Sequence, residues 1–254
     1  MRKTLVVSGG TRGIGRAIVE KFAQNGINVA FTYNTNVQIA EDMMADLSER
    51  HGVKLKAYHL DILEPNSYKN LFKEIDKDFE RIDYFISNAI ISGRSVAGGF
   101  SSFMRLKTTG LMNIYTATVL SFVVGAQEAA KRMEKIGGGA IISLSSTGNL
   151  FYTPNYAGHG NSKAAVETIV KYAAHELGEK GIRVNAVSGG PIDTDSFQKF
   201  PNYEKVKEEI IKRSPLSRMG VPDDLSGLCY FLTTENASWI TGQTFIVDGG
   251  LTFA

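Results

Sequence analysis

The chain has 254 residues, of which 43% are hydrophobic and 21% are charged, and its formal net charge at pH 7 is +2. These values are ordinary for a globular protein with a sizeable core. The small charge argues against binding to nucleic acid or to an anionic membrane. The single cysteine, Cys229, excludes an internal disulfide framework and a multi-cysteine metal site, and we predict no metal cofactor.

The N-terminal residues MRKTLVVSGG have the charge pattern of a signal peptide, but the apolar run of residues 5–7 is too short for one. No apolar run approaches the length that spans a bilayer. We therefore expect a cytoplasmic protein with no membrane partner.

Seven short runs rich in β-branched residues follow one another along the chain, and patterns with apolar residues three and four positions apart separate them. The predicted strands are residues 4–9, 28–33, 53–60, 82–87, 140–146, 182–188 and 243–249. Several helical patterns between them stop at a glycine, as at Gly26, Gly52 and Gly181. The alternation predicts an α/β protein with a single-domain Rossmann fold over residues 1–254, built on a parallel seven-stranded sheet with helices on both faces.

A glycine-rich turn, SGGTRGIG (8–15), follows the first predicted strand and runs directly into the first helical pattern. Such a turn lets a pyrophosphate approach bare backbone and lie at a helix N-terminus, where free N–H groups and the helix dipole attract anions. The alternative is a turn with a purely structural role. The candidate cofactor contacts in this turn are Gly9, Thr11, Arg12, Gly13, Ile14 and Gly15.

The glycine spacing, Gly9-x3-Gly13-x-Gly15, differs from the common dinucleotide fingerprint and resembles that of the short-chain dehydrogenase/reductase family. The second strand ends in FTYNTN (31–36) without the carboxylate that would bind a free ribose 2′-hydroxyl. Arg12 is placed to meet an anion, so we predict NADPH rather than NADH as the cofactor. The alternative is that Arg12 is only a solvated loop charge.

Further segments agree with this resemblance in order and spacing. The resemblance implies that Asp61 and Ile62 contact the adenine and that Asn88 and Ala89 end the fourth strand beside the cofactor. It also implies that Pro191, Ile192 and Thr194 contact the nicotinamide. The last predicted strand, within ITGQTFIVDGG (240–250), also resembles that of the family.

The stretch NYAGHGNSK (155–163) departs from the common family pattern, in which a catalytic tyrosine lies four residues before a lysine. Lys163 and Ser146 occupy the expected positions, but the place of the tyrosine is taken by His159. Tyr156 lies three residues earlier. On a helix it would face the same side, displaced along the axis by ~4.5 Å.

That displacement matches a different reaction. In the reduction of an enoyl thioester, hydride adds to the β-carbon and charge develops on the carbonyl oxygen two carbons away, where the donor is needed. The Tyr-x6-Lys spacing and the segments around it (127–139, 143–148, 161–172 and 184–202) resemble enoyl-acyl-carrier-protein reductase III, the FabL type. The resemblance implies that Tyr156 stabilises the enolate, Lys163 binds the nicotinamide ribose and Ser146 lines the substrate side.

Residues 192–215 are predicted to form a substrate lid over the cofactor cleft. Its apolar residues Phe197, Phe200, Ile210 and Ile211 are candidates for an acyl-chain pocket, and its lysines are candidates for contact with an acidic carrier protein. The alternative is an ordinary amphipathic pair of surface helices. We expect an enoyl thioester carried on acyl-carrier protein as the substrate, and the family resemblance implies a homotetramer or homodimer.

Three functions follow. The first is an NADPH-dependent enoyl-acyl-carrier-protein reductase of fatty-acid biosynthesis. The second is a short-chain carbonyl, 3-oxoacyl or hydroxysteroid-type reductase that uses Tyr156 in another pose or His159 as the acid. The third is a non-catalytic dinucleotide-binding sensor or scaffold, against which the joint presence of Ser146, Tyr156 and Lys163 argues.

Overall fold

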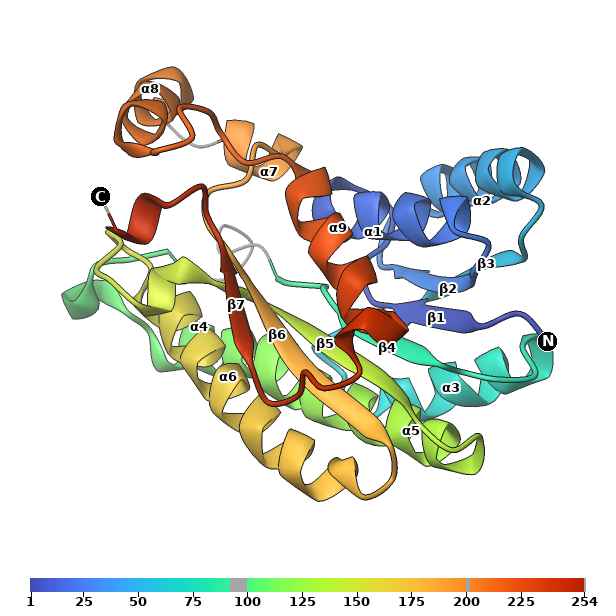
Figure 1. Cartoon of the computed structure of the whole chain (residues 1–254). Helices are drawn as coiled ribbons and strands as arrows, with labels where there is room; N and C mark the ends of the chain where they lie inside the picture. Colours follow the sequence, from blue (N-terminus) through green and yellow to red (C-terminus); the bar gives the residue numbers. More distant parts are fainter. Residues whose placement is uncertain (92–99, 200–201, 254) are drawn as a thin grey trace.

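Seven parallel strands form one sheet in the order β3-β2-β1-β4-β5-β6-β7, in a computed structural model that describes residues 1–91, 100–199 and 202–253 (Figure 1). The strands are β1 (Thr4–Val7), β2 (Asn28–Tyr33), β3 (Leu55–His59), β4 (Tyr84–Ser87), β5 (Gly139–Ser146), β6 (Ile182–Gly189) and β7 (Thr244–Val247). Every pair of neighbouring strands is parallel. The predicted α/β Rossmann fold with a seven-stranded parallel sheet is confirmed.

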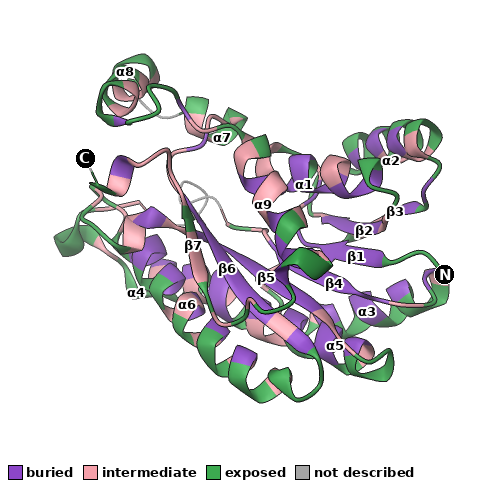
Figure 2. Ribbon diagram, in the orientation of Figure 1, coloured by how far each residue is buried: buried purple, intermediate pink, exposed green. Residues whose placement is uncertain are grey.

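Helices cover both faces of the sheet (Figure 1). One core cluster contains residues of α1 (Gly13–Gln24), α2 (Val37–His51) and α9 (Pro222–Thr233). The other contains residues of α3 (Ser67–Asp78), α5 (Ser121–Lys135) and α6 (Ala157–Gly178). Successive strand residues alternate between the two, since Leu5 and Val7 belong to the first and Val6 to the second. The central strands are therefore buried on both faces, whereas no residue of the edge strand β7 is buried (Figure 2).

The predicted glycine stops lie where the chain leaves the helices. Gly52 caps α2 in the left-handed region with φ 59°, and Gly26 and Gly181 also have positive φ values of 74° and 69°. A residue with a Cβ is strained in this region, which is why glycine ends these helices.

A long apolar helical stretch, Thr108–Lys135, contains α4 (Thr108–Tyr115), a π-helical turn (Thr116–Leu120) and α5. Its length and hydropathy suffice to cross a membrane, so the expectation that no apolar run approaches that length is wrong. Half of its most apolar window is buried against the rest of the chain. A core helix of a soluble protein passes the same test, and α5 packs on β4 and β5 as such a helix does.

Two helices follow β6, at the carboxyl edge of the sheet: α7 (Asp195–Gln198) and α8 (Tyr203–Arg213). No residue of α8 is buried, and the helix projects from the body of the protein (Figure 1). Residues 200–201 of the predicted lid, and so Phe200, lie outside the described residues. Phe197, Ile210 and Ile211 are partly exposed. The lid role of residues 192–215 stays a prediction.

Two helical glycines provide a matched test of core packing. A Cβ added to Gly125 on α5 would lie 2.6 Å from Phe85 Cζ and 2.9 Å from Tyr68 Cε1. A Cβ added to Gly227 on α9 would meet no atom within 4 Å. We expect Gly125→Ala to lower the free energy of unfolding by about 1–3 kcal/mol through overpacking. We expect Gly227→Ala to raise it by about 0.5–1 kcal/mol through helix propensity. Urea denaturation measures both, and equal effects of the two substitutions would contradict this packing.

Candidate active site

The glycine turn after β1 is built for close backbone contact. Gly9 and Gly13 have positive φ values of 73° and 54°, and a Cβ on Gly15 would lie 1.9 Å from the Gly9 carbonyl oxygen. Only glycine therefore allows α1 to start so close to the turn. The first turn of α1 has neither a side-chain cap nor an acidic residue, so its free N–H groups suit a phosphate.

Hydrogen bonds from two neighbouring segments, the end of β4 and strand β2, hold this turn. The Asn88 side chain donates to the carbonyl oxygens of Ser8 and Gly9 at 3.0 and 2.9 Å, and the backbone N–H groups of Asn88 and Ala89 donate to Ser8 Oγ at 3.1 Å. The Gly9 N–H donates to Thr32 Oγ1 at 3.0 Å. Asn88 thus shapes the turn, together with Ser8 and Thr32, to which the sequence analysis assigned no role.

The predicted nicotinamide segment lies against the same turn. A Cβ on Gly13 would lie 3.5 Å from the Thr194 methyl group, and Thr194 Oγ1 caps α7 by accepting a hydrogen bond from Phe197 N at 3.3 Å. Ile192 is buried and forms an isolated parallel bridge with Gly220. The structure therefore brings the glycine turn and residues 191–194 together, as the sequence predicted.

The remaining predicted cofactor residues are three further residues of the turn and two residues that follow β3. Asp61 Oδ1 accepts a hydrogen bond from Leu63 N at 2.9 Å, and the Ile62 carbonyl accepts one from Ser121 Oγ at 2.7 Å. Arg12 is the exposed N-cap residue of α1. Thr11 and Ile14, its neighbours, are partly exposed. These residues fit a dinucleotide that enters along the carboxyl edge of the sheet.

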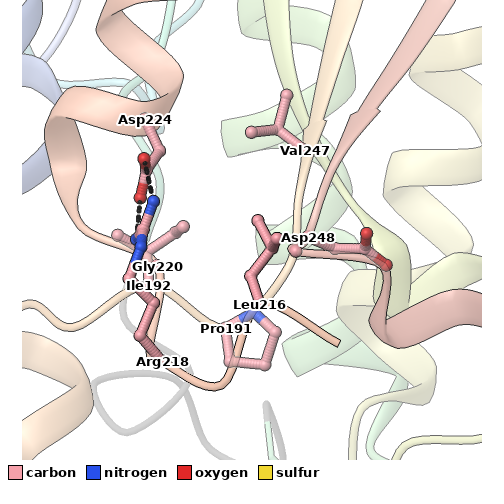
Figure 3. A pocket seen from close by; sticks show the side chains of 9 residues that line it. Pro191, Ile192, Leu216, Arg218, Gly220, Asp224, Val247 and Asp248 are labelled. Atoms are coloured by element: carbon pink, nitrogen blue, oxygen red, sulfur yellow. Dashed lines mark hydrogen bonds and ion pairs between the residues drawn. The ribbon is translucent and has the colours of Figure 1, made fainter. Parts of the chain in front are cut away.

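A small cavity of about 120 Å³ lies behind the nicotinamide segment (Figure 3). It is lined by Pro191, Ile192, Leu216, Arg218, Gly220, Asp224, Val247, Asp248 and Gly249. An ion pair between Arg218 and Asp224, at 2.7 Å, closes one side. None of Ser146, Tyr156 and Lys163 lines it. The cavity is therefore separate from the candidate catalytic residues.

Tyr156 is the N-cap residue of α6, immediately before the helix in which the sequence analysis had placed it. Its carbonyl accepts the first helical hydrogen bond, from Gly160 N at 2.8 Å. Its ring lies against Gly148, where a Cβ would be 2.6 Å from Tyr156 Cε1. Burial raises the pKa of the phenol and a hydrogen bond with Ser146 partly opposes the rise. The hydroxyl is thus a protonated hydrogen-bond donor at neutral pH.

Lys163 is buried on the second turn of α6, and its Nζ donates to the Leu144 carbonyl at the end of β5 at 2.6 Å. Burial lowers the pKa of this ammonium to about 8, and the negative charge of Glu167 acts in the opposite direction. The group therefore carries a positive charge at neutral pH in a water-poor environment, where a charge acts strongly on its neighbours.

His159, in the place of the usual tyrosine, is only 3% exposed and belongs to a cluster of three aromatic rings. Its ring stacks on Tyr156 at 5.4 Å between centroids and on Phe100 at 4.8 Å. Burial, with a smaller effect of Lys163, lowers the pKa of His159 to about 4, so the imidazole is neutral at pH 7. Within the described part of the chain, its Nε2 atom has no hydrogen-bond partner.

Three contributors to the site were missed from the sequence. Phe100 comes from a distant loop and gives no signal in the sequence. The Leu144 carbonyl is a backbone group, which side-chain patterns do not identify. Glu167, which accepts a hydrogen bond from Ser145, does give a signal, because it follows Lys163 by four residues and therefore shares its helix face.

The chain matches known proteins over almost its whole length. A family model described as "Enoyl-(Acyl carrier protein) reductase" matches residues 9–252. A 1-cyclohexenylcarbonyl-CoA reductase of Streptomyces collinus is 36% identical over 252 residues, covering 98% of this chain and 87% of the relative. A 3-oxoacyl-[acyl-carrier-protein] reductase, FabG, of Staphylococcus aureus is 32% identical over 251 residues, covering 99% and 98%.

The fold also matches solved structures. The structure of ElxO with NADP bound superposes with a TM-score of 0.89 at 29% sequence identity and covers 100% of both chains. The relatives include reductases of both carbon–carbon double bonds and ketones by name, so similarity alone does not distinguish these reactions.

The low pKa of His159 predicts an acid-sensitive fold. The imidazole of the unfolded chain titrates near 6.5, whereas that of the folded chain titrates at about 4. The unfolded state therefore binds more protons between these values, and the free energy of unfolding falls as the pH drops through this window. We expect His159→Phe, which preserves a ring in the cluster, to flatten this decline in urea denaturation between pH 7 and pH 4.5. His175→Phe, at an exposed position of the same helix, is the control and should keep the slope of the wild type.

Proposed function

The chain belongs to the short-chain dehydrogenase/reductase superfamily of oxidoreductases, and we propose that it is an NADPH-dependent enoyl-thioester reductase of fatty-acid biosynthesis. The observation that carries the proposal is the position of the acidic hydroxyl. Tyr156 is the N-cap residue of α6 and its phenol is influenced by Ser146, while the usual tyrosine position holds the neutral, buried His159. The only phenol beside Lys163 in NYAGHGNSK is therefore the displaced one.

The residues around the glycine turn fit a dinucleotide, because the turn leaves uncapped N–H groups at the start of α1 and no side chain at Gly9, Gly13 or Gly15 obstructs them. Asn88 would hold the turn in shape, and Thr194, beside Gly13, would face the same ligand. A bound reduced nicotinamide supplies hydride to the β-carbon of the substrate.

The chain's own side chains act on the thioester end of the substrate. As the double bond accepts hydride at the β-carbon, its electron pair moves toward the carbonyl oxygen, and protonation at the α-carbon completes the reduction. The Tyr156 hydroxyl donates a hydrogen bond to that oxygen and Ser146 orients the hydroxyl. The buried ammonium of Lys163 stabilises the developing negative charge.

The carrier of the acyl group is proposed to be acyl-carrier protein. Exposed basic side chains lie on and beside α8, at Lys199, Lys205, Lys212 and Arg213, and they would attract an acidic carrier. The Streptomyces relative is named for a coenzyme A thioester, whose phosphates the same charges would also attract. The substrate class common to both is an enoyl thioester.

A second candidate function is reduction of a 3-oxoacyl thioester, which the relative from Staphylococcus aureus favours. It requires an acid beside the reacting carbon, where His159 lies. The low pKa of His159 disfavours this role. At pH 7 its imidazole is neutral, so the protonated form that would act as the acid is not populated.

Assembly into a homotetramer or homodimer is also proposed. Apolar side chains are exposed on the helical stretch that contains α4 and the π turn, at Met112 (62%) and Leu120 (42%). A second copy of the chain that covers these residues would remove them from water.

A pair of thioester assays tests the function. We expect oxidation of NADPH with crotonyl thioester and little with acetoacetyl thioester. We expect Tyr156→Phe to lower kcat about 10²–10³-fold, as the loss of one transition-state hydrogen-bond donor does. His159→Phe is the matched ring variant and should change kcat only slightly. The opposite ranking of substrates and variants would favour the ketone reductase. Tight NADPH binding without turnover of either thioester would favour a non-catalytic dinucleotide-binding protein.

Cofactor preference is tested at the exposed N-cap of α1. Arg12 is the N-cap residue of α1, and the end of β2, at Tyr33 and Asn34, provides no carboxylate to repel a 2′-phosphate. We expect Arg12→Ala to weaken NADPH binding roughly 10- to 100-fold and to leave NADH binding almost unchanged, because a hydrogen bond to a charged group contributes about 1.5–3 kcal/mol. Arg16→Ala removes a charge one turn further along α1, where Arg16 pairs with Glu20 at 2.8 Å, and is the control. A wild-type preference for NADH would contradict the assignment.

A further inference from the structure

The last three residues of β5 each act on a different residue of α6 or its N-cap. The Leu144 carbonyl accepts a hydrogen bond from Lys163 Nζ, and the Ser145 hydroxyl donates to Glu167 Oε1. Ser146 lowers the pKa of the Tyr156 phenol, against the larger effect of burial. The first and the last involve Lys163 and Tyr156, which have roles in the proposed reaction. The middle contact, Ser145 with Glu167, has no role in the function proposed above.

Glu167 is placed to act on Lys163 rather than on solvent. It lies four residues after Lys163 on α6, so the two side chains share a helix face at a spacing of about 5–6 Å between Cβ atoms. Ser145 lies two residues after Ser143 and four after Ile141, on the face of β5 that α6 covers. The carboxylate is only partly exposed and is held by a buried hydroxyl.

The elements that pack around Lys163 supply no other charge within the described residues. Strand β5 contains no titratable side chain, helix α4 contains only the phenol of Tyr115, and the buried polar side chain of the π turn is Thr118. On β6, Ser188 is buried beside Ser145 and Arg183 lies at the other end of the strand. On α5 the charges begin at Glu128, which pairs with Lys131 and Arg132.

The two nearest ionisable groups on the N-terminal side of Lys163 are uncharged at neutral pH, since the His159 imidazole is neutral and the Tyr156 phenol is protonated. The carboxylate of Glu167 is thus the charge that acts on the buried ammonium.

We propose that Glu167 is a positioning residue, anchored by Ser145, which keeps the ammonium of Lys163 charged and directed at the carboxyl end of β5. The inference rests on the proposed function, because the developing enolate is what makes a charged Lys163 necessary. Its physical reason is desolvation. A buried lysine loses its proton more readily than an exposed one, and an opposite charge within about 4–6 Å restores the charged form.

Three substitutions separate the charge from its anchor. Glu167→Gln removes the charge at nearly constant shape. Ser145→Ala keeps the charge and removes the hydrogen bond that holds it. Ser188→Ala removes a buried hydroxyl from the strand position paired with Ser145 and leaves Glu167 untouched, so it is the matched control.

The decisive measurement is the titration of Lys163 itself, followed by NMR of protein labelled with [ε-¹³C]lysine and assigned with Lys163→Arg. We expect the midpoint to fall by about one pH unit in Glu167→Gln. We expect a smaller fall in Ser145→Ala and none in Ser188→Ala. An unchanged midpoint in Glu167→Gln overturns the proposal. If Glu167→Gln does not fold, the comparison of Ser145→Ala with Ser188→Ala decides, and equal midpoints in these two overturn it.

The pH profile of kcat with crotonyl thioester provides the functional readout. The basic limb, where Lys163 loses its proton, should move to lower pH in Glu167→Gln by the same amount as the NMR midpoint. The two failures are distinguishable. An inactive wild type with a shifted NMR midpoint contradicts the proposed function alone, whereas an active wild type with an unshifted midpoint contradicts only the role of Glu167.

Discussion

All seven strands run in the same direction, and this constraint determines where the helices and the candidate site lie. Each connection must return across a face of the sheet, so both faces are covered by helices and the strands are apolar on both sides. The same constraint places every carboxyl end at one edge. The glycine turn after β1, Asn88 after β4, Ser146 at the end of β5 and residues 191–194 after β6 meet there although they are far apart in the chain.

A buried positive charge organises the catalytic side of that edge. Lys163 has a carbonyl acceptor at the end of β5, and its surroundings contain Tyr156 and His159, which are both uncharged at neutral pH. An ammonium in such a place acts strongly on any negative charge that develops nearby, because little water screens it. The same burial makes the charge costly to maintain, and Glu167 offsets part of that cost.

The displaced tyrosine depends on small residues as much as on its own position. Tyr156 lies outside the regular helix, and its ring fits against Gly148, where even a methyl group would collide with it. The ring of His159 fills the space that the displacement leaves, between Tyr156 and Phe100. The geometry of the candidate active site is therefore a joint property of the β5 end, the turn that follows it and the start of α6.

The sequence by itself determined the sheet, its apolar strands, the glycine stops and the glycine turn, because these depend on local periodicity and on backbone conformations that glycine alone adopts freely. Together with the family resemblance, the spacing also made Ser146, Tyr156 and Lys163 the candidate catalytic residues. Only the tertiary structure decided that Tyr156 is an N-cap residue and that Phe100 joins its ring cluster. It also decided that the Leu144 carbonyl accepts a hydrogen bond from Lys163 and that Ser145 holds Glu167. Those contacts join segments whose separation in the sequence carries no information about their distance in space, and their effects on protonation arise from burial, which exists only once the core has formed.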